Sequence, residues 1–208
     1  MIVIADSGST KCDWIITNGQ EEIRTKTQGF NPMFHSSQLI EDKLRDNKDL
    51  SGLANRVEAV YYYGAGCQNG ELNKTVQTAL SNVFKNAHVH VDHDIRAAIM
   101  ATCQGKPGIS CILGTGSNSA YFDGKDIHNR VSGLGYILGD EGSGSYFGKK
   151  LLSAFLYGQL PETINQELRA QGLSKETIIN KVYMQPNANV YLASFMKFVS
   201  NHKDLPYF

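Results

Sequence analysis

The sequence has no excess of charge of either sign, no long apolar run and no closely paired cysteines. Its 20 Lys and Arg residues balance 20 Asp and Glu residues, so nothing favours a polyanion such as nucleic acid as the main partner. The apolar start MIVIA meets Asp6 at once, and no later run approaches the ~20 residues of a membrane span. Cys12, Cys67, Cys103 and Cys111 lack the spacing of metal ligands and are interpreted as reduced packing residues. We therefore expect a cytoplasmic protein that binds neither nucleic acid nor a membrane.

The 208 residues are 41% apolar and can bury a core. The order of predicted strands and helices is that of an α/β domain. Residues 2–16, IVIADSGSTKCDWII, predict two strands around a polar turn, and Asn18–Gly19 predicts a hairpin into a third strand. A helix capped by Ser36 or Ser37 follows. The patterns then predict strands at 57–66 and 88–92, each followed by a helix, at 72–83 and 95–103.

A second copy of the opening pattern begins after the linker QGKPG at 104–108. The segment CILGTGSNSAYFDGKDIH contains a strand, a polar turn at 114–117, a second strand and a hairpin signal at Asp123–Gly124. The two polar turns are almost as far apart in the sequence as the two hairpin turns, which indicates a duplication. We therefore expect two lobes, 1–107 and 108–208, whose polar turns face one ligand across a central cleft.

The polar turns have the composition of a polyphosphate site. Glycines let backbone N–H groups approach an anion, and hydroxyls add further donors. Asp6 offers a hard oxygen to Mg²⁺, or it only caps the turn. Lys11 either adds positive charge or points to solvent by strand alternation. The residues predicted to hold the phosphates are Asp6, Gly8, Ser9, Thr10, Lys11, Thr115, Gly116 and Ser117.

The stretches IADSGSTKCDW, YYYGAG, CILGTGSNS and SGLGYILGDEGSGSYFG together resemble the N-acetylglucosamine kinase branch of the actin, heat-shock chaperone and sugar kinase superfamily. That branch lies within the group that includes the benzoyl-CoA reductase ATPase subunits. The resemblance covers residues 2 to about 150. It implies an α/β fold of two ribonuclease-H-like lobes, with ATP, Mg²⁺ and the sugar in the cleft. Family members continue with a glycine-rich segment that holds the adenosine, so the resemblance implies an incomplete second lobe ending at Phe208.

The resemblance also implies roles for individual residues. Asp94, which precedes an Ala-rich helix, matches the base that accepts the proton of the sugar 6-hydroxyl, although an Asp there can also cap the helix. Asn31, Asn118 and Asp140 match sugar-contacting positions. Glu141 is interpreted as a charge at the N-terminus of a helix over 146–157.

The sequence departs from the family pattern at two places. Ser132-Gly133-Leu134-Gly135 stands where many relatives carry Gly-Gly-Trp-Gly, so the aromatic platform is replaced. Ser7 and Ser9 stand where the commonest phosphate turn has glycines.

The predicted function is ATP-dependent phosphorylation of an amino sugar, with N-acetylglucosamine to its 6-phosphate as the leading reaction. One alternative is an ATPase activator of a dehydratase or reductase, which needs cysteines to share an iron–sulfur cluster, a pattern that Cys67 and Cys103 do not supply. Another is a non-catalytic sugar sensor, which would lose the base or the magnesium residue, yet Asp94 and Asp6 are both present. The expected partners are the amino sugar and ATP, with a homodimer as a possible assembly.

Overall fold

A computed structural model of the chain describes residues 1–68, 70–129 and 133–205. The chain divides into two compact units. The first unit is Met1–Ser110 with Ala120–Arg130, and the second is Cys111–Ser119 with Val131–Phe208. The mixed α/β class predicted from the sequence is confirmed, whereas the lobe boundary between residues 107 and 108 stays a prediction.

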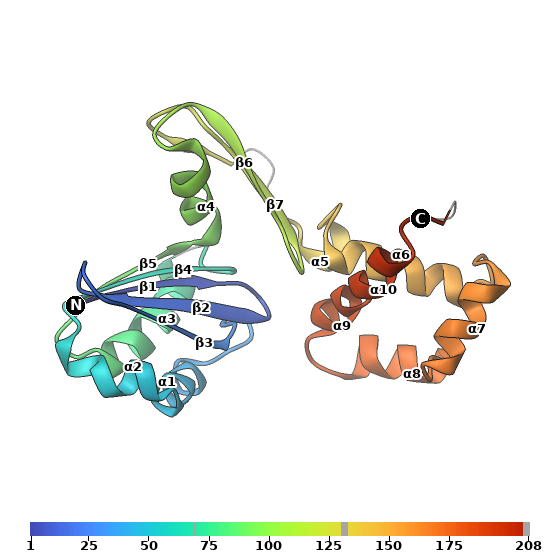
Figure 1. Cartoon of the computed structure of the whole chain (residues 1–208), viewed down its shortest axis with the longest axis horizontal. Coiled ribbons are helices and arrows are strands. Elements are labelled where there is room, and N and C mark those ends of the chain that lie inside the picture. Colours follow the sequence, from blue (N-terminus) through green and yellow to red (C-terminus); the bar gives the residue numbers. More distant parts are fainter. Residues whose placement is uncertain (69, 130–132, 206–208) are drawn as a thin grey trace. The chain divides into compact units, whose positions relative to one another are not determined.

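The first unit is built on a five-stranded sheet with the order β3-β2-β1-β4-β5 (Figure 1). The first three strands form an antiparallel meander, and β1 pairs in parallel with β4, which pairs in parallel with β5. All five strands predicted for this region are confirmed, and the fourth begins two residues later than expected. Their bounds are β1 Ile2–Ser7, β2 Lys11–Thr17, β3 Glu22–Gln28, β4 Ala59–Gly64 and β5 His88–His93.

Helices cover both faces of this sheet, with α1, α2 and α3 on one face and α4 on the other (Figure 1). Ser36 caps α1, since its hydroxyl accepts a hydrogen bond from the Leu39 N–H at 3.3 Å. Asn47 caps α2 through the Leu50 N–H at 3.1 Å, and α2 is a helix that the sequence patterns did not predict. The bounds are α1 Ser37–Asp46, α2 Lys48–Leu53, a 3₁₀ turn at Ala54–Arg56, α3 Gly70–Val83 and α4 Asp94–Cys103.

Strand alternation separates the core of this unit from its polar edge. Along β1 the side chains of Val3, Ala5 and Ser7 are buried, while Ile4 and Asp6 are exposed on the opposite face. The buried face packs on α1, α2 and α3 around the large side chains Trp14, Phe30, Tyr62 and Phe84. Asp6 is therefore held by a strand whose other face is anchored in the main core.

The strands β6 Gly108–Leu113, β7 Ser117–Phe122 and β8 Ile127–His128 form a three-stranded sheet in that order. Gly124 has a φ of +100° in the turn before β8, and Gly19 has a φ of +90° in the corresponding turn before β3. Both hairpin turns predicted from Asn-Gly and Asp-Gly are thus confirmed, because each needs a glycine in the left-handed region.

The second unit is mainly helical. Gly148 lets α6 and α9 pack closely, since a methyl group at this position would overlap the backbone carbonyl of Leu192. Across the residues that the structure describes, no helix combines the length and apolarity needed to cross a membrane. The helices are α5 Gly135–Leu138, α6 Gly144–Leu156, α7 Glu162–Ala170, α8 Lys175–Ile179, a π-helical turn at Asn180–Met184, α9 Ala188–Ser194 and α10 Met196–Asn201.

Candidate functional site

The candidate site of the first unit lies at the carboxyl edge of its parallel strands. In the sheet register, Asp6 on β1 lies beside Tyr63 on β4, and Tyr63 lies beside Asp92 on β5. Asp94 follows β5 directly as the first residue of α4. Ligands of open α/β sheets bind outside the carboxyl ends of the strands, so these carboxylates occupy the position expected for a binding site.

The first polar turn is fixed by the segment that follows β3. The Gly8 N–H donates to the Lys11 carbonyl at 2.9 Å, and the Gly29 N–H donates to the Thr10 carbonyl at 3.1 Å. A methyl group on Gly29 would overlap the carbonyl oxygen of Gly8, so only glycine allows this contact. The buried Ser7 hydroxyl also accepts the Phe30 N–H at 3.0 Å. The backbone of the turn is therefore held by one hydrogen bond within it and by contacts with Gly29, while Phe30 bonds the adjoining Ser7.

Sequence reasoning missed the supporting roles of Gly29 and Ser7. Both roles depend on contacts between segments about twenty residues apart in the sequence. The one local signal that could have indicated the role of Gly29 is its position two residues before the predicted sugar contact Asn31.

Asp6 lies in a locally negative environment. Partial burial raises the pKa of the Asp6 carboxyl above its ordinary value, and the nearby charges of Asp94 and Asp13 raise it further. Lys11 lowers this pKa only weakly, because its ammonium group pairs with Asp13 Oδ2 at 2.7 Å and is largely exposed. Of the two orientations open for Lys11, the structure has the solvent-facing one. A half-exposed carboxylate whose pKa is raised by neighbouring negative charges is suited to a hard cation, so Asp6 fits Mg²⁺.

Asp92 and Asp94 have different partners, although only one residue separates them. Asp92 Oδ2 lies 3.3 Å from Arg96 Nε and 3.6 Å from His90 Nε2, while its Oδ1 accepts the His93 N–H at 2.7 Å. Asp94 Oδ1 lies 2.5 Å from His93 Nδ1 and accepts the Ile95 N–H at 2.8 Å. Asp92 is therefore tied to a cation on α4, whereas Asp94 interacts electrostatically with Asp6.

Asn31 begins a tight turn that packs on Gly66, two residues after the end of β4. Its backbone carbonyl accepts the N–H groups of Phe34 and His35, at 2.9 and 3.0 Å, and its Oδ1 accepts the Met33 N–H at 3.0 Å. The side-chain amide lies directly on Gly66, whose φ of +83° and missing side chain make room for it. The structure thus holds Asn31 in one orientation within the first unit, and its predicted sugar contact stays a prediction.

The second unit contains the other polar turn, and it joins this turn to Asp140. The Gly114 N–H donates to the Gly116 carbonyl at 2.9 Å, and the first N–H groups of α6, at Gly144 and Ser145, donate to the carbonyls of Gly114 and Thr115 at 2.9 and 3.0 Å. The turn is therefore packed on the N-terminus of a helix, where backbone dipoles favour an anion.

Asp140 lies against this second turn. Its Oδ1 accepts the Ser117 N–H at 3.3 Å, and its carboxylate fills the space that a side chain at Gly116 would need. Partial burial raises the pKa of the Asp140 carboxyl, against the opposing effect of the Ser117 hydrogen bond. Asp140 has a φ of +57°, a conformation that Asp tolerates better than most residues. A predicted sugar contact and predicted phosphate contacts are thus neighbours in this unit.

Each unit therefore gathers its own part of the predicted residue set. The first holds Asp6 and Asp94 with the turn at 8–11, and the second holds Asp140 and Asn118 with the turn at 115–117. Within the described parts of the chain, no group of three or more His, Cys, Asp or Glu side chains could hold a metal ion by itself. Ser132, where the family pattern is broken, lies outside the described residues.

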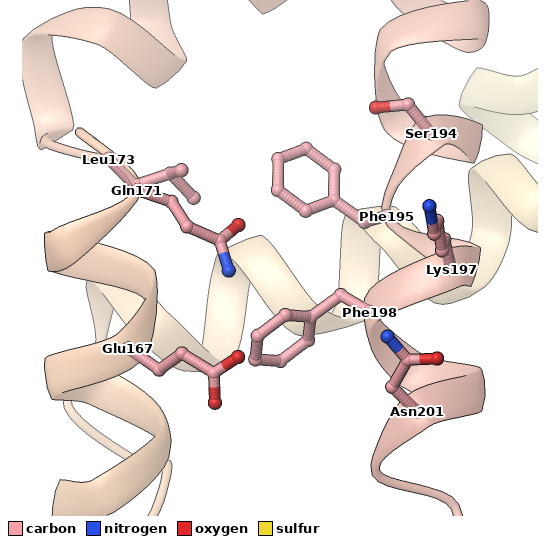
Figure 2. Close-up of a pocket in the computed structure, with 8 residues that line it drawn as sticks. All are labelled: Glu167, Gln171, Leu173, Ser194, Phe195, Lys197, Phe198 and Asn201. Atoms are coloured by element: carbon pink, nitrogen blue, oxygen red, sulfur yellow. The ribbon is translucent and has the colours of Figure 1, made fainter.

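A pocket of about 410 Å³ lies elsewhere in the second unit (Figure 2). Phe195 and Phe198 point from the α9–α10 segment toward Glu167 and Gln171 of α7 and the turn that follows it. None of the residues predicted for phosphate or sugar contact lines this pocket. It is therefore separate from both polar turns.

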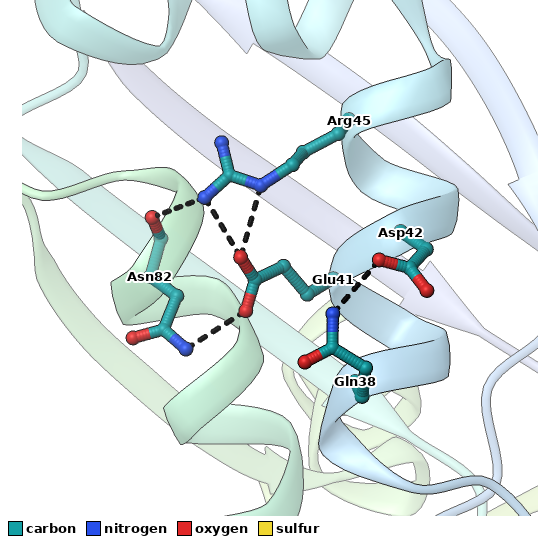
Figure 3. A network of polar contacts seen from close by, with 5 residues as sticks. All are labelled: Gln38, Glu41, Asp42, Arg45 and Asn82. Atoms are coloured by element: carbon teal, nitrogen blue, oxygen red, sulfur yellow. Dashed lines mark hydrogen bonds and ion pairs between the residues drawn. The ribbon is translucent and has the colours of Figure 1, made fainter.

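A polar cluster between α1 and α3 is also separate from the site (Figure 3). Glu41 Oε1 accepts hydrogen bonds from Arg45 Nε and Nη2 at 2.9 and 2.8 Å, and Glu41 Oε2 accepts one from the Asn82 amide at 2.8 Å. Arg45 also donates to the Asn82 carbonyl at 2.9 Å, and Gln38 donates to Asp42 at 2.9 Å. The hydrogen bonds of Glu41 and Arg45 to Asn82 join α1 to α3, so this cluster has a structural role.

The chain is similar to known proteins over most of its length. A model of the BadF/BadG/BcrA/BcrD ATPase family matches residues 5–197. A solved structure from Porphyromonas gingivalis, described as a "putative N-acetylglucosamine kinase", is 41% identical, with a TM-score of 0.91 over 100% of this chain and 75% of its own. A structure from Chromobacterium violaceum, described in the same words, is 17% identical, with a TM-score of 0.60 over 98% of this chain and 74% of its own, and shows a shared fold. No curated protein matches the sequence.

Proposed function

Because the chain belongs to the BadF/BadG/BcrA/BcrD ATPase family, we propose that it uses ATP to phosphorylate a sugar, and that the sugar is N-acetylglucosamine and the acceptor its 6-hydroxyl. The family match confirms the predicted resemblance to the group that includes the benzoyl-CoA reductase ATPase subunits. The similarity to the Porphyromonas gingivalis protein, 41% identical across the whole of this chain, supports the choice of a sugar as acceptor.

The observation that carries the proposal is that Asp6 and Asp94 both lie at the carboxyl edge of the parallel strands. Asp6 is the second-last residue of β1, just before the polar turn, Asp94 begins the helix after β5, and the charge of Asp94 raises the pKa of Asp6. One carboxylate beside a phosphate-binding turn and a second available as a base match what phosphoryl transfer needs, which is mainly alignment and charge neutralisation.

In the proposed reaction, Asp94 accepts the proton of the sugar hydroxyl while the hydroxyl oxygen attacks the γ-phosphorus of ATP. The new O–P bond forms as the bond to the β-phosphate oxygen breaks, and ADP leaves. In this proposal the turns at 8–11 and 115–117 each supply donors to the phosphates, from their hydroxyls and from backbone N–H groups other than those of Gly8 and Ser117, which donate within the protein. Mg²⁺, which Asp6 would hold, neutralises phosphate charge when it is bound. Asn31, Asn118 and Asp140 orient the sugar through its hydroxyl and acetamido groups.

The ATPase-activator alternative requires cysteines that can ligate a cluster, and the Cys67 thiol does not favour it. Burial raises the pKa of the Cys67 thiol to about 12, with further contributions from Asp94 and Asp92, so this thiol is protonated at neutral pH. Thiolates are the ligands of iron–sulfur clusters. Cys67 is therefore a poor ligand for a cluster shared between subunits.

The test is a coupled assay of ADP release with ATP, Mg²⁺ and a panel of N-acetylglucosamine, glucosamine, N-acetylmannosamine and glucose. We expect the highest kcat/KM with N-acetylglucosamine, and a ³¹P spectrum of the product should show the 6-phosphate. ADP release that no sugar accelerates would overturn the proposal in favour of an ATPase. Calorimetric binding of a sugar without turnover would instead support the sugar sensor.

A further inference from the structure

We propose that His93 is a positioning residue for Asp94: its Nδ1–H donates to Asp94 Oδ1 and fixes the carboxylate that acts as the base. This inference rests on the proposed function, and it adds a residue that neither the motifs nor the family resemblance assigns. It starts from one contact, in which His93 Nδ1 lies 2.5 Å from Asp94 Oδ1.

This contact requires a proton between the two atoms. A deprotonated Nδ1 and a carboxylate oxygen each present a lone pair, and two such acceptors repel each other at 2.5 Å. A nitrogen that donates to an ionised carboxylate gives a short, strong hydrogen bond instead. The side chains of His93 and Asp94 are only 16% and 15% exposed, so water competes weakly for this bond.

The neighbouring N–H of Ile95 fits the same assignment. It lies 2.8 Å from Asp94 Oδ1 and 3.2 Å from His93 Nδ1. The shorter contact is to the carboxylate, which accepts readily, and a protonated Nδ1 cannot accept. Asp94 Oδ1 therefore receives two donors, from His93 and Ile95, and this fixes the rotation of the carboxyl group. The proton of the sugar hydroxyl is then taken by Oδ2.

The backbone of His93, which carries the imidazole, is held in place by the sheet and by Asp92. His93 is the last residue of β5 and lies beside Gly64 of β4 in the register. Its backbone N–H donates to Asp92 Oδ1 at 2.7 Å, while Asp92 Oδ2 lies 3.3 Å from Arg96 Nε. In the sequence Asp92-His93-Asp94, the carboxylate of Asp92 positions the backbone of His93, and the imidazole of His93 positions the carboxylate of Asp94.

The competing explanation is that His93 only caps α4. A cap contributes about 1 kcal/mol to stability and nothing to the chemical step. A positioning residue lowers kcat when it is removed and leaves KM unchanged, because it acts through the base and does not touch the substrate. Misplacing a reacting group by about 1 Å can cost about 10²-fold in rate.

The experiment compares His93→Ala with His93→Asn in the coupled assay. Alanine removes the imidazole and with it the donor to Asp94, and we expect kcat to fall about 10- to 100-fold while KM for sugar and ATP stays within about twofold. Asparagine keeps an N–H donor near the Nδ1 position and caps helices well, so it should recover most of the lost kcat. His90→Ala is the matched control, since His90 is half exposed and contacts Asp92, and its kcat should be unchanged.

A second measurement does not depend on activity. Nitrogen-15 NMR of the histidine rings should show the His93 Nδ1 protonated in the wild-type chain, and Asp94→Ala should shift this signal toward the other tautomer. An unprotonated Nδ1, or a His93→Ala variant with normal kcat, overturns the positioning role even if the chain is a kinase. A protonated Nδ1 in a chain that phosphorylates no sugar overturns the proposed function and leaves the hydrogen bond standing.

Discussion

Replacing Asp94 by Asn separates the two roles that its side chain can have. Asp94 is the first residue of α4, and in Asp94→Asn the new amide oxygen can still accept the Ile95 N–H. Loss of the negative charge at the start of α4 costs about 0.3–1 kcal/mol, and relief of the repulsion with Asp6 offsets part of it. The melting temperature should therefore fall by less than about 4 °C for a chain of this size.

The catalytic effect of Asp94→Asn is much larger than this. An amide cannot accept the hydroxyl proton, and a general base contributes about 10²–10⁴ in rate. We therefore expect kcat for N-acetylglucosamine to fall by that factor, while sugar and ATP bind with nearly unchanged affinity.

Asp92→Asn is the control that the sequence itself provides. Asp92 loses its ion pair with Arg96, whose side chain is 52% exposed, and such exposed pairs contribute only about 0.2–1 kcal/mol. The amide oxygen can still accept the His93 N–H. We therefore expect activity within a few-fold of wild type.

Coupled ADP release and circular dichroism melting of the two variants decide between the roles. Near-normal kcat in Asp94→Asn would refute Asp94 as the base. Loss of activity in Asp92→Asn, with Asp94→Asn active, would assign the base to Asp92 and require a different mechanism.

Three further perturbations test the scaffold. Ser7→Ala leaves the buried Phe30 N–H without its hydroxyl acceptor and should lower the free energy of unfolding by about 1–3 kcal/mol in urea titrations. Gly148→Ala forces a methyl group onto a backbone carbonyl of α9 and should cost about 1–3 kcal/mol, measured in the same way. The pKa of His202 is raised above its ordinary 6.5 by its bond to the Phe198 carbonyl and by Glu167. The contribution of His202 to the free energy of unfolding is therefore complete below pH 6.5 and is lost as the pH rises through the raised pKa. Urea titrations from pH 5.5 to 8.5 should show this decline, and His202→Phe should abolish it.

Matched controls sharpen the scaffold tests. Ser9→Ala changes a hydroxyl in the same turn as Ser7 but outside the buried core, so its free energy of unfolding should stay near wild type. Gly52→Ala places a methyl group where nothing lies within 4 Å and improves the helix propensity of α2, so it should stabilise the chain by up to about 1 kcal/mol. Equal losses in Gly52→Ala and Gly148→Ala would contradict the close packing of α6 on α9.

The strands of the first unit could be predicted because local sequence determines them. Alternating apolar residues mark β1 and β2, and Asn18–Gly19 marks the turn that joins β2 to β3. The helix α2 could not be predicted, because its six residues are too few to show a helical period and its start depends on the Asn47 cap. Residues 162–201 carry no such motif, so the helices α7 to α10 are findings of the structure alone.

The sequence predicted which residues belong to the candidate site better than it predicted how their side chains are oriented and packed. The polar turns and the carboxylates after the strands follow from motifs, but the orientation of Lys11 depends on Asp13, which lies beside Lys26 across the β2–β3 pair. The role of Gly29 depends on the backbone of Gly8. Contacts between distant segments are set by sheet register and packing, which short motifs do not encode.

Three of the four free cysteines can report chemically on the opening of the first unit. Cys12 and Cys67 are buried, so an alkylating reagent reaches them only when the first unit opens, whereas Cys111 in the second unit is exposed and reacts directly. Each ~1.4 kcal/mol of opening free energy slows modification of a buried thiol about tenfold. A ligand that binds the first unit therefore lengthens the lifetime of Cys12 and Cys67 while the lifetime of Cys111 stays the same.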